Sequence, residues 1–456
     1  MMVELTQVSK WTLEELPRQN RAILADDLSP AALTEAMCLD VLPTLPGPER
    51  LDRPQARQLL VNLGFAGASV ARHFQERVPG GMQDPQRAFA GLAVGESAVP
   101  FQAYFAALAD RTGTGHCHRD SYASLVRWNV GTVQVRLDGE LLASLPGDFD
   151  DGRIRSYTGS GAEERFFSLV KRGEALELAV NDLLEPLTCD GTRLDGGDAV
   201  LRVRLATALL QAMRQLFLDF TGLPPERSMP PDHFMDVFRQ FAVHWLPDDI
   251  PPSGALDPEA LKRDFLLGIG MAGYAGHVRR LFPALLADER AAIEALMAQP
   301  TLPQRLLASL DVDAATLATA DLAALRRLVG RHPALADWYG LLNEHARVAG
   351  AHLMLSKKFL FKPQRRRDEA GLGDRPLVSN RSGTTGMTET FLERLTRARR
   401  EHVFAPLRPV LTGETATNAP DAGVRSQSET AASVAVSLVA HRGGQAMTVP
   451  PATTRG

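Results

Sequence analysis

Two histidines, His345 and His352, stand seven residues apart in a segment with a strong helical pattern, and their spacing suits metal binding. Seven residues are close to two helical turns, so both imidazoles lie nearly on one face. Ala349, Gly350 and Ala351 precede His352, and such small side chains let a flat group approach the helix. A neutral imidazole is a good iron ligand, which makes His352 a candidate haem ligand. From spacing alone, a packed or surface histidine is the more frequent role.

Arg239 lies in an aromatic-rich segment, MPPDHFMDVFRQFAVHW (229–245), that has an amphipathic helical pattern. An arginine following Phe234 and Met235 by one to two turns can point into an apolar pocket and hold a carboxylate through two N–H groups. A structural ion pair with Asp236 is the alternative, and local sequence favours it.

A short loop, Ser-Gly-Thr-Thr-Gly at 382–386, is rich in hydroxyls and backbone N–H groups. Such a loop can close over a ligand or cradle an anion. It is not a phosphate-binding P-loop, because no lysine follows the glycine and no predicted strand precedes it. An ordinary turn is the alternative.

The composition bounds the protein class. The chain of 456 residues is 45% hydrophobic and only 6% aromatic, and Ala, Leu and Arg dominate, which favours a mainly α fold with a large core. Its formal net charge of −4 provides no field that would recruit nucleic acid. No apolar stretch is long enough to span a membrane, and the N-terminus lacks signal-peptide features. The three cysteines are far apart in the sequence, which fits a reducing compartment. We therefore expect a cytoplasmic protein.

The pattern along the chain predicts three parts: a smaller mixed N-terminal subdomain (1–155), a large helical domain (156–412) that would bind the haem, and a disordered tail (413–456). In the first part, residues 1–50 are polar and proline-rich and are expected to be an irregular or docking segment. Helices are expected over 53–78 and 100–109, and a strand or hairpin over 131–142. Further helices are expected over 163–184, 198–221, 231–246, 257–282, 287–298, 303–310, 321–330, 334–360 and 388–403, with a polar loop at 364–386.

Four segments in order carry a family resemblance: MPPDHFMDVFRQFAVHW (229–245), PPSGALDPEALKRDFLLGIGMAGYAGH (251–277), AHLMLSKKFLF (351–361) and SGTTGMTETFLERL (382–395). The chain resembles the indoleamine 2,3-dioxygenase and tryptophan 2,3-dioxygenase superfamily. Within it, the chain looks closest to the bacterial branch that includes the tryptophan-rearranging enzyme of pyrrolnitrin biosynthesis. The resemblance covers residues 160–403, is thin before them, and is absent from the tail. Order and spacing make it more specific than any single motif.

The resemblance implies a role for several residues around a haem b. His352 matches the proximal iron ligand, and Arg239 matches the arginine that holds the substrate carboxylate. Phe234 and Met235 match distal aromatic positions, although Met235 replaces an expected phenylalanine. The loop that passes near the haem propionates is matched by Ser253 and Gly254.

Other matched positions depart from the family pattern. Gly383, Thr384 and Gly386 match the loop that closes over the amino acid, with Thr385 in place of a further glycine. On the distal helix, the resemblance places Phe166, Phe167 and Val170 beside the substrate, and Val170 stands where a small hydroxyl residue would lie.

Beside the ligand, Asp264 matches an aspartate whose arginine partner would stand at position 349, which is Ala349 here. We therefore expect altered electrostatics on the proximal side.

The resemblance implies a haem-dependent oxygenase that acts on tryptophan or a related indole amino acid, with O2 activated at ferrous haem. Monooxygenation or rearrangement of a tryptophan derivative in secondary metabolism is an alternative, and the departures at Met235, Val170 and Ala349 favour it somewhat. A non-catalytic haem-binding sensor and a helical interaction protein without a cofactor are alternatives from other classes. The expected partners are the small-molecule substrate and O2, with no nucleic acid and no membrane, and a homo-oligomer is left open.

Overall fold

The computed structural model describes residues 2–115, 118–371, 387–413, 435–442 and 445–448. The chain is 67% helical and 5% strand, which confirms the mainly α fold. Among the described residues, none of the helices combines the length and the apolar character that a bilayer crossing needs.

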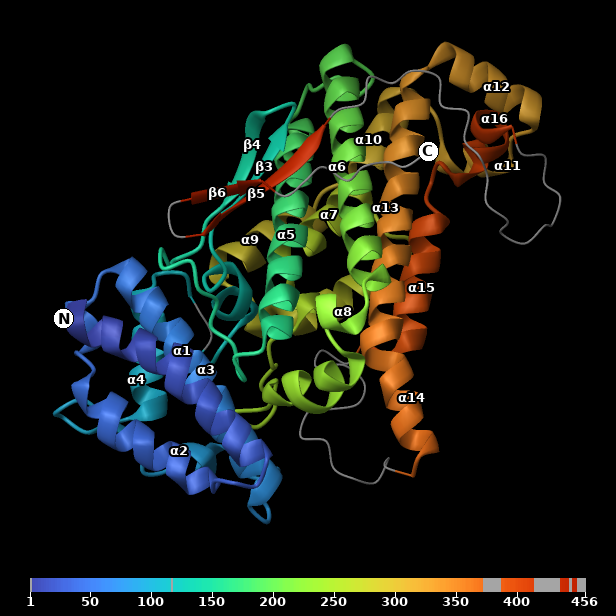
Figure 1. Ribbon diagram of the computed structural model, residues 1–456. Coiled ribbons are helices and arrows are strands. Elements are labelled where there is room, and N and C mark those ends of the chain that lie inside the picture. The colour runs from blue at the N-terminus through green and yellow to red at the C-terminus, as the bar shows by residue number, and fades with distance from the viewer. Residues whose placement is uncertain (1, 116–117, 372–386, 414–434, 443–444, 449–456) are drawn as a thin grey trace.

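The N-terminal region is built of helices α1 (Met2–Leu24), α2 (Pro30–Ala36), α3 (Arg53–Arg77) and α4 (Phe101–Arg111), which gather at one end of the molecule (Figure 1). A capping box between Asp52 and Gln55 starts α3. The expectation that residues 1–50 are irregular is wrong for α1 and α2. The buried side chains of α1 recur at helical spacing, and the prolines at 43, 46 and 48 lie beyond both helices.

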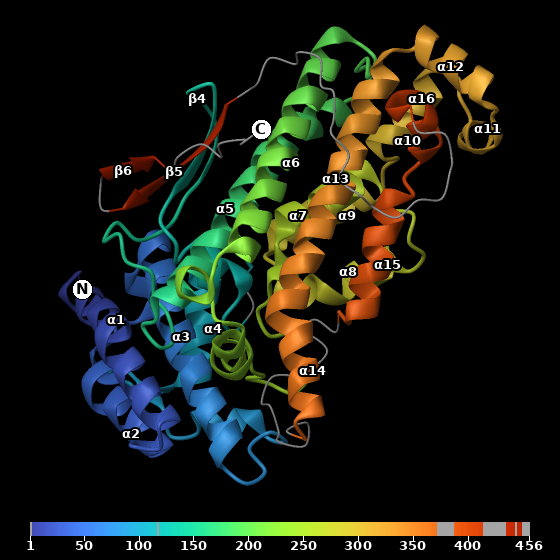
Figure 2. The same ribbon diagram turned by 45° about the vertical axis from the view of Figure 1, so that its right-hand side comes forward.

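A small antiparallel sheet lies on the outer side of α5 (Gly161–Leu184) (Figures 1 and 2). Its order is β4 (Glu140–Leu145), β3 (Val133–Leu137), β5 (Val436–Arg442) and β6 (Gln445–Thr448). The expected hairpin is therefore confirmed. A separate two-stranded ladder joins β1 (Ala93–Val94) and β2 (Val99–Pro100).

The expectation of a disordered tail over 413–456 is wrong for β5, which pairs along the whole of β3. Its aliphatic residues include Leu438 and Val439, which are buried, whereas β3 without β5 would present an open edge. The Thr- and Ser-rich composition of the tail concealed this strand. Residues 414–434 lie outside the described part of the chain.

The helical domain is organised around four long helices that lie side by side: α5, α6 (Gly197–Gly222), α13 (Ala334–Ser356) and α15 (Glu389–Arg400) (Figure 2). Helix α7 (Pro258–Leu267) packs against α5. The remaining α-helices are α8 (Tyr274–Leu281), α9 (Ala287–Met297), α10 (Leu302–Ser309), α11 (Ala314–Thr319), α12 (Leu322–Arg331), α14 (Lys362–Glu369) and α16 (Arg408–Thr412). Short 3-10 or π turns lie at Met37–Val41, Leu42–Thr44, Pro48–Arg50, Pro85–Phe89, Ala123–Arg127, Glu185–Thr188, Pro225–Arg227, His233–Val237, Phe238–Phe241, Gly254–Leu256, Phe282–Ala284, Lys357–Phe361 and Ala405–Leu407.

Three predicted helices differ from the structure. The segment 231–246 forms only short π and 3-10 turns, which end at Phe241. The segment 257–282 is divided into α7 and α8, because Gly268 and Gly273 both have a φ of +81°, outside the helical region. Helix α13 does not stop at Lys362-Pro363, and so the predicted loop from 364 is helical to Glu369. A wide π turn at Lys357–Phe361 precedes the proline and accommodates its missing N–H.

Two apolar clusters form the core. One surrounds α3 and reaches Trp245 and Val278 in the later part of the chain. The other fills the space between α5, α6 and α13, includes the fully buried Trp338, and extends to residues of β3 and β4. The hairpin within residues 1–155 therefore packs on the helical domain.

Docking of β5 can be tested at Leu438, which is 8% exposed and belongs to the second cluster. We expect Leu438→Ala to lower the free energy of unfolding by about 2 kcal/mol, as for other buried leucines. The neighbouring Ser437→Ala, at a half-buried position, should change it by less than about 0.5 kcal/mol. Urea denaturation measures both values. Equal stability of the Leu438→Ala variant and the wild type would show that β5 does not dock.

Candidate functional site

A cavity of about 340 Å³ lies between α5, α6, α7, α13 and α15. Its volume falls in the range of small-molecule sites, and apolar side chains form most of its wall. It brings together eight residues that the sequence assigned to the site: Phe166, Phe167, Val170, Phe234, Arg239, Ser253, Gly254 and His352. Gly383, Thr384 and Gly386 lie outside the described residues.

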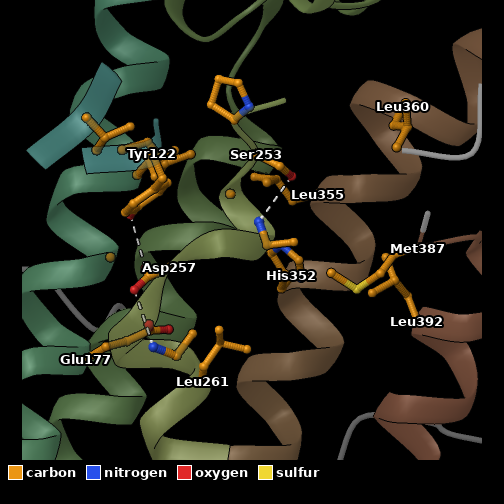
Figure 3. Close-up of a pocket in the computed structure, with 18 of the residues that line it drawn as sticks. Tyr122, Glu177, Ser253, Asp257, Leu261, His352, Leu355, Leu360, Met387 and Leu392 are labelled. Atoms are coloured by element: carbon orange, nitrogen blue, oxygen red, sulfur yellow. Dashed lines mark hydrogen bonds between the residues drawn. The ribbon is translucent and has the colours of Figure 1, made fainter. Parts of the chain in front are cut away.

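His352 projects into this cavity from α13 (Figure 3). Its side chain is open to the cavity space but enclosed by protein, and this burial, followed by the nearby charges of Arg399 and Arg263, lowers its pKa to about 4. Within the described residues the ring forms no hydrogen bond, and its aromatic neighbour Phe217 lies 6.1 Å away between ring centroids. The imidazole is thus neutral at pH 7, with a nitrogen lone pair that no described residue engages.

The wall next to His352 contains small side chains that would leave room for a flat group held by the imidazole. Of the three small residues that precede the histidine, Ala349 lines the cavity. Ala351 is buried. A side chain at Gly350 would point toward Arg400 and not into the cavity. No group of three or more metal-ligating side chains exists among the described residues. A haem iron needs only one protein ligand, so the single imidazole is consistent with a haem site.

An aromatic wall forms another side of the cavity. Phe166 packs against Phe234 and Phe238, with ring centroids 5.1 and 5.4 Å apart, and Phe167 lies 5.3 Å from Phe238. Val170 follows on the same helix and also lines the cavity. Such rings provide a rigid apolar surface for a planar ligand.

Arg239 lines the cavity beside this wall and is only 7% exposed. Burial lowers its pKa to about 10, so the guanidinium remains charged at neutral pH. The alternative partner, Asp236, forms an ion pair at 2.5 Å with Arg367. Met235 is fully buried and does not line the cavity; its sulfur lies 3.7 Å from Nη1 of Arg239. Its effect on a ligand would therefore pass through the arginine.

Two neighbouring residues of α7 carry buried ion pairs at the cavity wall. Arg263 donates to Glu177 of α5 at 2.9 Å, and Asp264 accepts from Arg399 of α15 at 2.6 Å. Asp264 also accepts a hydrogen bond from the Tyr274 hydroxyl. Burial by itself raises the pKa of Asp264, but Arg399 and a contact with His345 lower it below the ordinary value.

The sequence prediction missed Glu177, Arg263 and Arg399, because charged residues in amphipathic helices are normally assigned to the solvent face. A signal was present for α7, where the Arg-Asp pair interrupts an apolar run (LKRDFLL). Asp264 does have an arginine partner, which comes from α15 and not from position 349.

A second polar cluster lies at the far end of the cavity from His352 (Figure 3). The Tyr122 hydroxyl lies 3.2 Å from Asp257 and 3.2 Å from Glu174. Asp257 also caps α7 by accepting from the backbone N–H of Glu259 and Ala260. This cluster fixes the start of α7 against the cavity.

Comparison of the chain with family models found no match, and comparison with curated proteins found none either. The chemistry of the site therefore rests on its geometry and on the resemblance of the four segments described above.

His345 gives the site a pH-dependent stability. Burial lowers its pKa to about 4, whereas an unfolded histidine titrates near 6.5. Between these values the unfolded chain binds more protons, so the stability must fall as the pH falls from about 6.5 to 4, by up to about 3 kcal/mol from this residue. We expect His345→Gln to flatten this part of the stability profile.

Urea denaturation between pH 4 and 7 measures the effect. His118→Gln, at an exposed position, is the matched control and should follow the wild-type profile. Parallel profiles for the wild type and His345→Gln would contradict the prediction.

Proposed function

We propose that the chain is a haem-dependent oxygenase that acts on tryptophan or a closely related indole amino acid. The observation that carries the proposal is the common cavity of His352, Arg239 and the aromatic wall. They come from three parts of the sequence: α13 provides His352, the turns at 233–241 provide Arg239 and part of the aromatic wall, and α5 provides the rest of the wall. Each corresponds to a need of the chemistry: an iron ligand, a carboxylate partner and a surface for the indole ring.

His352 would hold the haem iron, because its imidazole is neutral and engaged in no hydrogen bond within the described residues. Ser253 and Gly254 line the same cavity and would lie at the edge of the group. When bound as ferrous haem, the cofactor supplies the binding and activation of O2. The protein keeps water out of the site through its apolar wall.

Arg239 and the aromatic wall would position the substrate. A buried guanidinium matches a carboxylate through two parallel N–H bonds, and its strength is greatest in a dry pocket. Phe166, Phe234 and Phe238 offer faces and edges to a planar indole. Simultaneous contact with both ends selects an amino acid over free indole, and the proposed reaction depends on this positioning more than on an acid or base.

One observation favours a second candidate, monooxygenation or rearrangement of a tryptophan derivative. Val170 lines the cavity, and its side chain has no hydroxyl to donate to a ligand there. Product analysis under O2 distinguishes this reaction from ring cleavage to an N-formylkynurenine-type product.

Haem binding is the first test. Protein expressed with a haem precursor should show a Soret absorption band, and His352→Ala should lose the band or shift it to shorter wavelength. His118→Ala removes an exposed histidine outside the cavity and should leave the spectrum unchanged. A wild-type protein without a Soret band would refute the proposal, and a band unaffected by His352→Ala would refute the assigned ligand.

Substrate binding is the second test. L-tryptophan added to the haem-loaded protein should shift the spectrum, which gives a dissociation constant. Since a hydrogen-bonded charge pair contributes about 1.5–3 kcal/mol, Arg239→Gln should weaken binding by about 10- to 100-fold. Arg239→Lys keeps the charge but loses the two-point geometry. Its dissociation constant for tryptophan should therefore lie between those of the wild type and Arg239→Gln.

Indole, which lacks the carboxylate, is the control ligand. The wild type and both Arg239 variants should bind indole with the same affinity. An equal loss for indole and tryptophan would show that Arg239 shapes the pocket and does not bind a carboxylate. A haem spectrum that no indole compound perturbs would favour a non-catalytic haem sensor.

A further inference from the structure

The ion pair of Asp264 and Arg399 joins α7 to α15 beside the cavity that His352 faces. Nη2 of Arg399 lies 2.6 Å from Oδ2 of Asp264, and Nε lies 3.2 Å from Oδ1. The guanidinium therefore holds the carboxylate at two points. The side chains are 12% and 3% exposed, so water contributes little to their solvation.

The face of α13 that carries His352 turns toward this same carboxylate. Nε2 of His345 lies 3.3 Å from Oδ1 of Asp264. Ala349 follows one turn later on the same face, and both Ala349 and Arg399 line the cavity. A long side chain at position 349 would project into the space next to Asp264. Alanine leaves this space to the guanidinium that arrives from α15.

We propose that Arg399 is a positioning residue for the His352 site. From α15, Arg399 neutralises and orients the Asp264 carboxylate. An arginine at position 349, which is alanine in this chain, would do the same from α13. Asp264 in turn holds the Tyr274 hydroxyl and contacts His345, so its orientation determines how α7 and α13 meet. The electrostatic part of this inference rests on the proposed haem at His352.

The first experiment measures the pair in protein prepared without haem, by urea denaturation. Arg399→Leu leaves a buried carboxylate without its cation, so the unfolding equilibrium constant should rise on the order of a hundredfold. Arg397→Leu, at an exposed position of the same helix, is the matched control and should change it little. Adding Ala349→Arg to Arg399→Leu should recover at least about tenfold of the loss, because the guanidinium returns to the same carboxylate.

Arg399→Lys keeps a charge and provides a measurable variant should Arg399→Leu not fold; its effect should lie between wild type and Arg399→Leu. Combined with Ala349→Arg, it should also gain stability relative to Arg399→Lys alone. No recovery on introduction of the arginine at position 349, or an effect of Arg397→Leu equal to that of Arg399→Leu, would overturn the proposal.

The second experiment measures the midpoint potential of the bound haem. Loss of the positive charge in Arg399→Leu should lower the potential, and loss of the negative charge in Asp264→Asn should raise it. The exchanged pair, Ala349→Arg with Arg399→Leu, should return it toward the wild-type value. Shifts of the same sign in both single variants would indicate a mere loss of structure and would overturn the electrostatic role.

The two experiments separate this inference from the proposed function. Absence of haem from the wild type refutes the oxygenase proposal, whereas the urea series still decides whether Arg399 and an arginine at position 349 are interchangeable. Conversely, haem binding through His352 with no recovery in the urea series refutes the role of Arg399 alone.

Discussion

The buried ion pairs of α7 are the constraint on which the site depends. Arg263 and Asp264 are consecutive in sequence, and they bind Glu177 of α5 and Arg399 of α15. Consecutive helical residues point about 100° apart, so one short helix can be anchored to two different neighbours. Breaking such a pair leaves an uncompensated buried charge, which costs about 3–5 kcal/mol. The ion pairs therefore fix the positions of α5 and α15 relative to α7. Since α5 and α15 form opposite walls of the cavity, the ion pairs also fix the positions of these walls.

The cavity between these helices remains open because its walls are stiff. Phenylalanine rings pack edge to face along one side, and α13 presents alanine, not a large side chain, next to His352. The charged network of α7 also contributes to the lining, and its charges are paired within the protein. A ligand in the cavity thus meets mostly apolar walls, with the imidazole of His352 and the guanidinium of Arg239 among the polar groups. Sites with few, well-placed polar groups bind in a defined orientation.

Chain order connects α15 and α13 to different parts of the cavity wall. Helix α15 carries Arg399 and begins directly after the segment that contains Gly383, Thr384 and Gly386. Helix α13 carries both His345 and His352, and the Asp264 carboxylate contacts the first of them. A displacement of α15 would therefore change the surroundings of the carboxylate on which α13 rests. The ion pair is the physical connection between these elements.

The sequence by itself determined the helical class and most helix positions, because these depend on local periodicity. It also named His352 and Arg239 as candidates, through the resemblance of the four segments together with residue chemistry. It did not determine the partner of Asp264, since Arg399 is 135 residues distant and reads as a solvent-exposed helix position. Nor did it determine strand β5, whose pairing with β3 depends on an open edge almost 300 residues away in the chain, or the breaks in the helical pattern near Gly268 and Gly273. Long-range pairing is decided by which surfaces remain uncovered after the helices pack, and that depends on the whole fold. The sequence proposed the chemical groups, and only the tertiary structure decided which of them share one cavity.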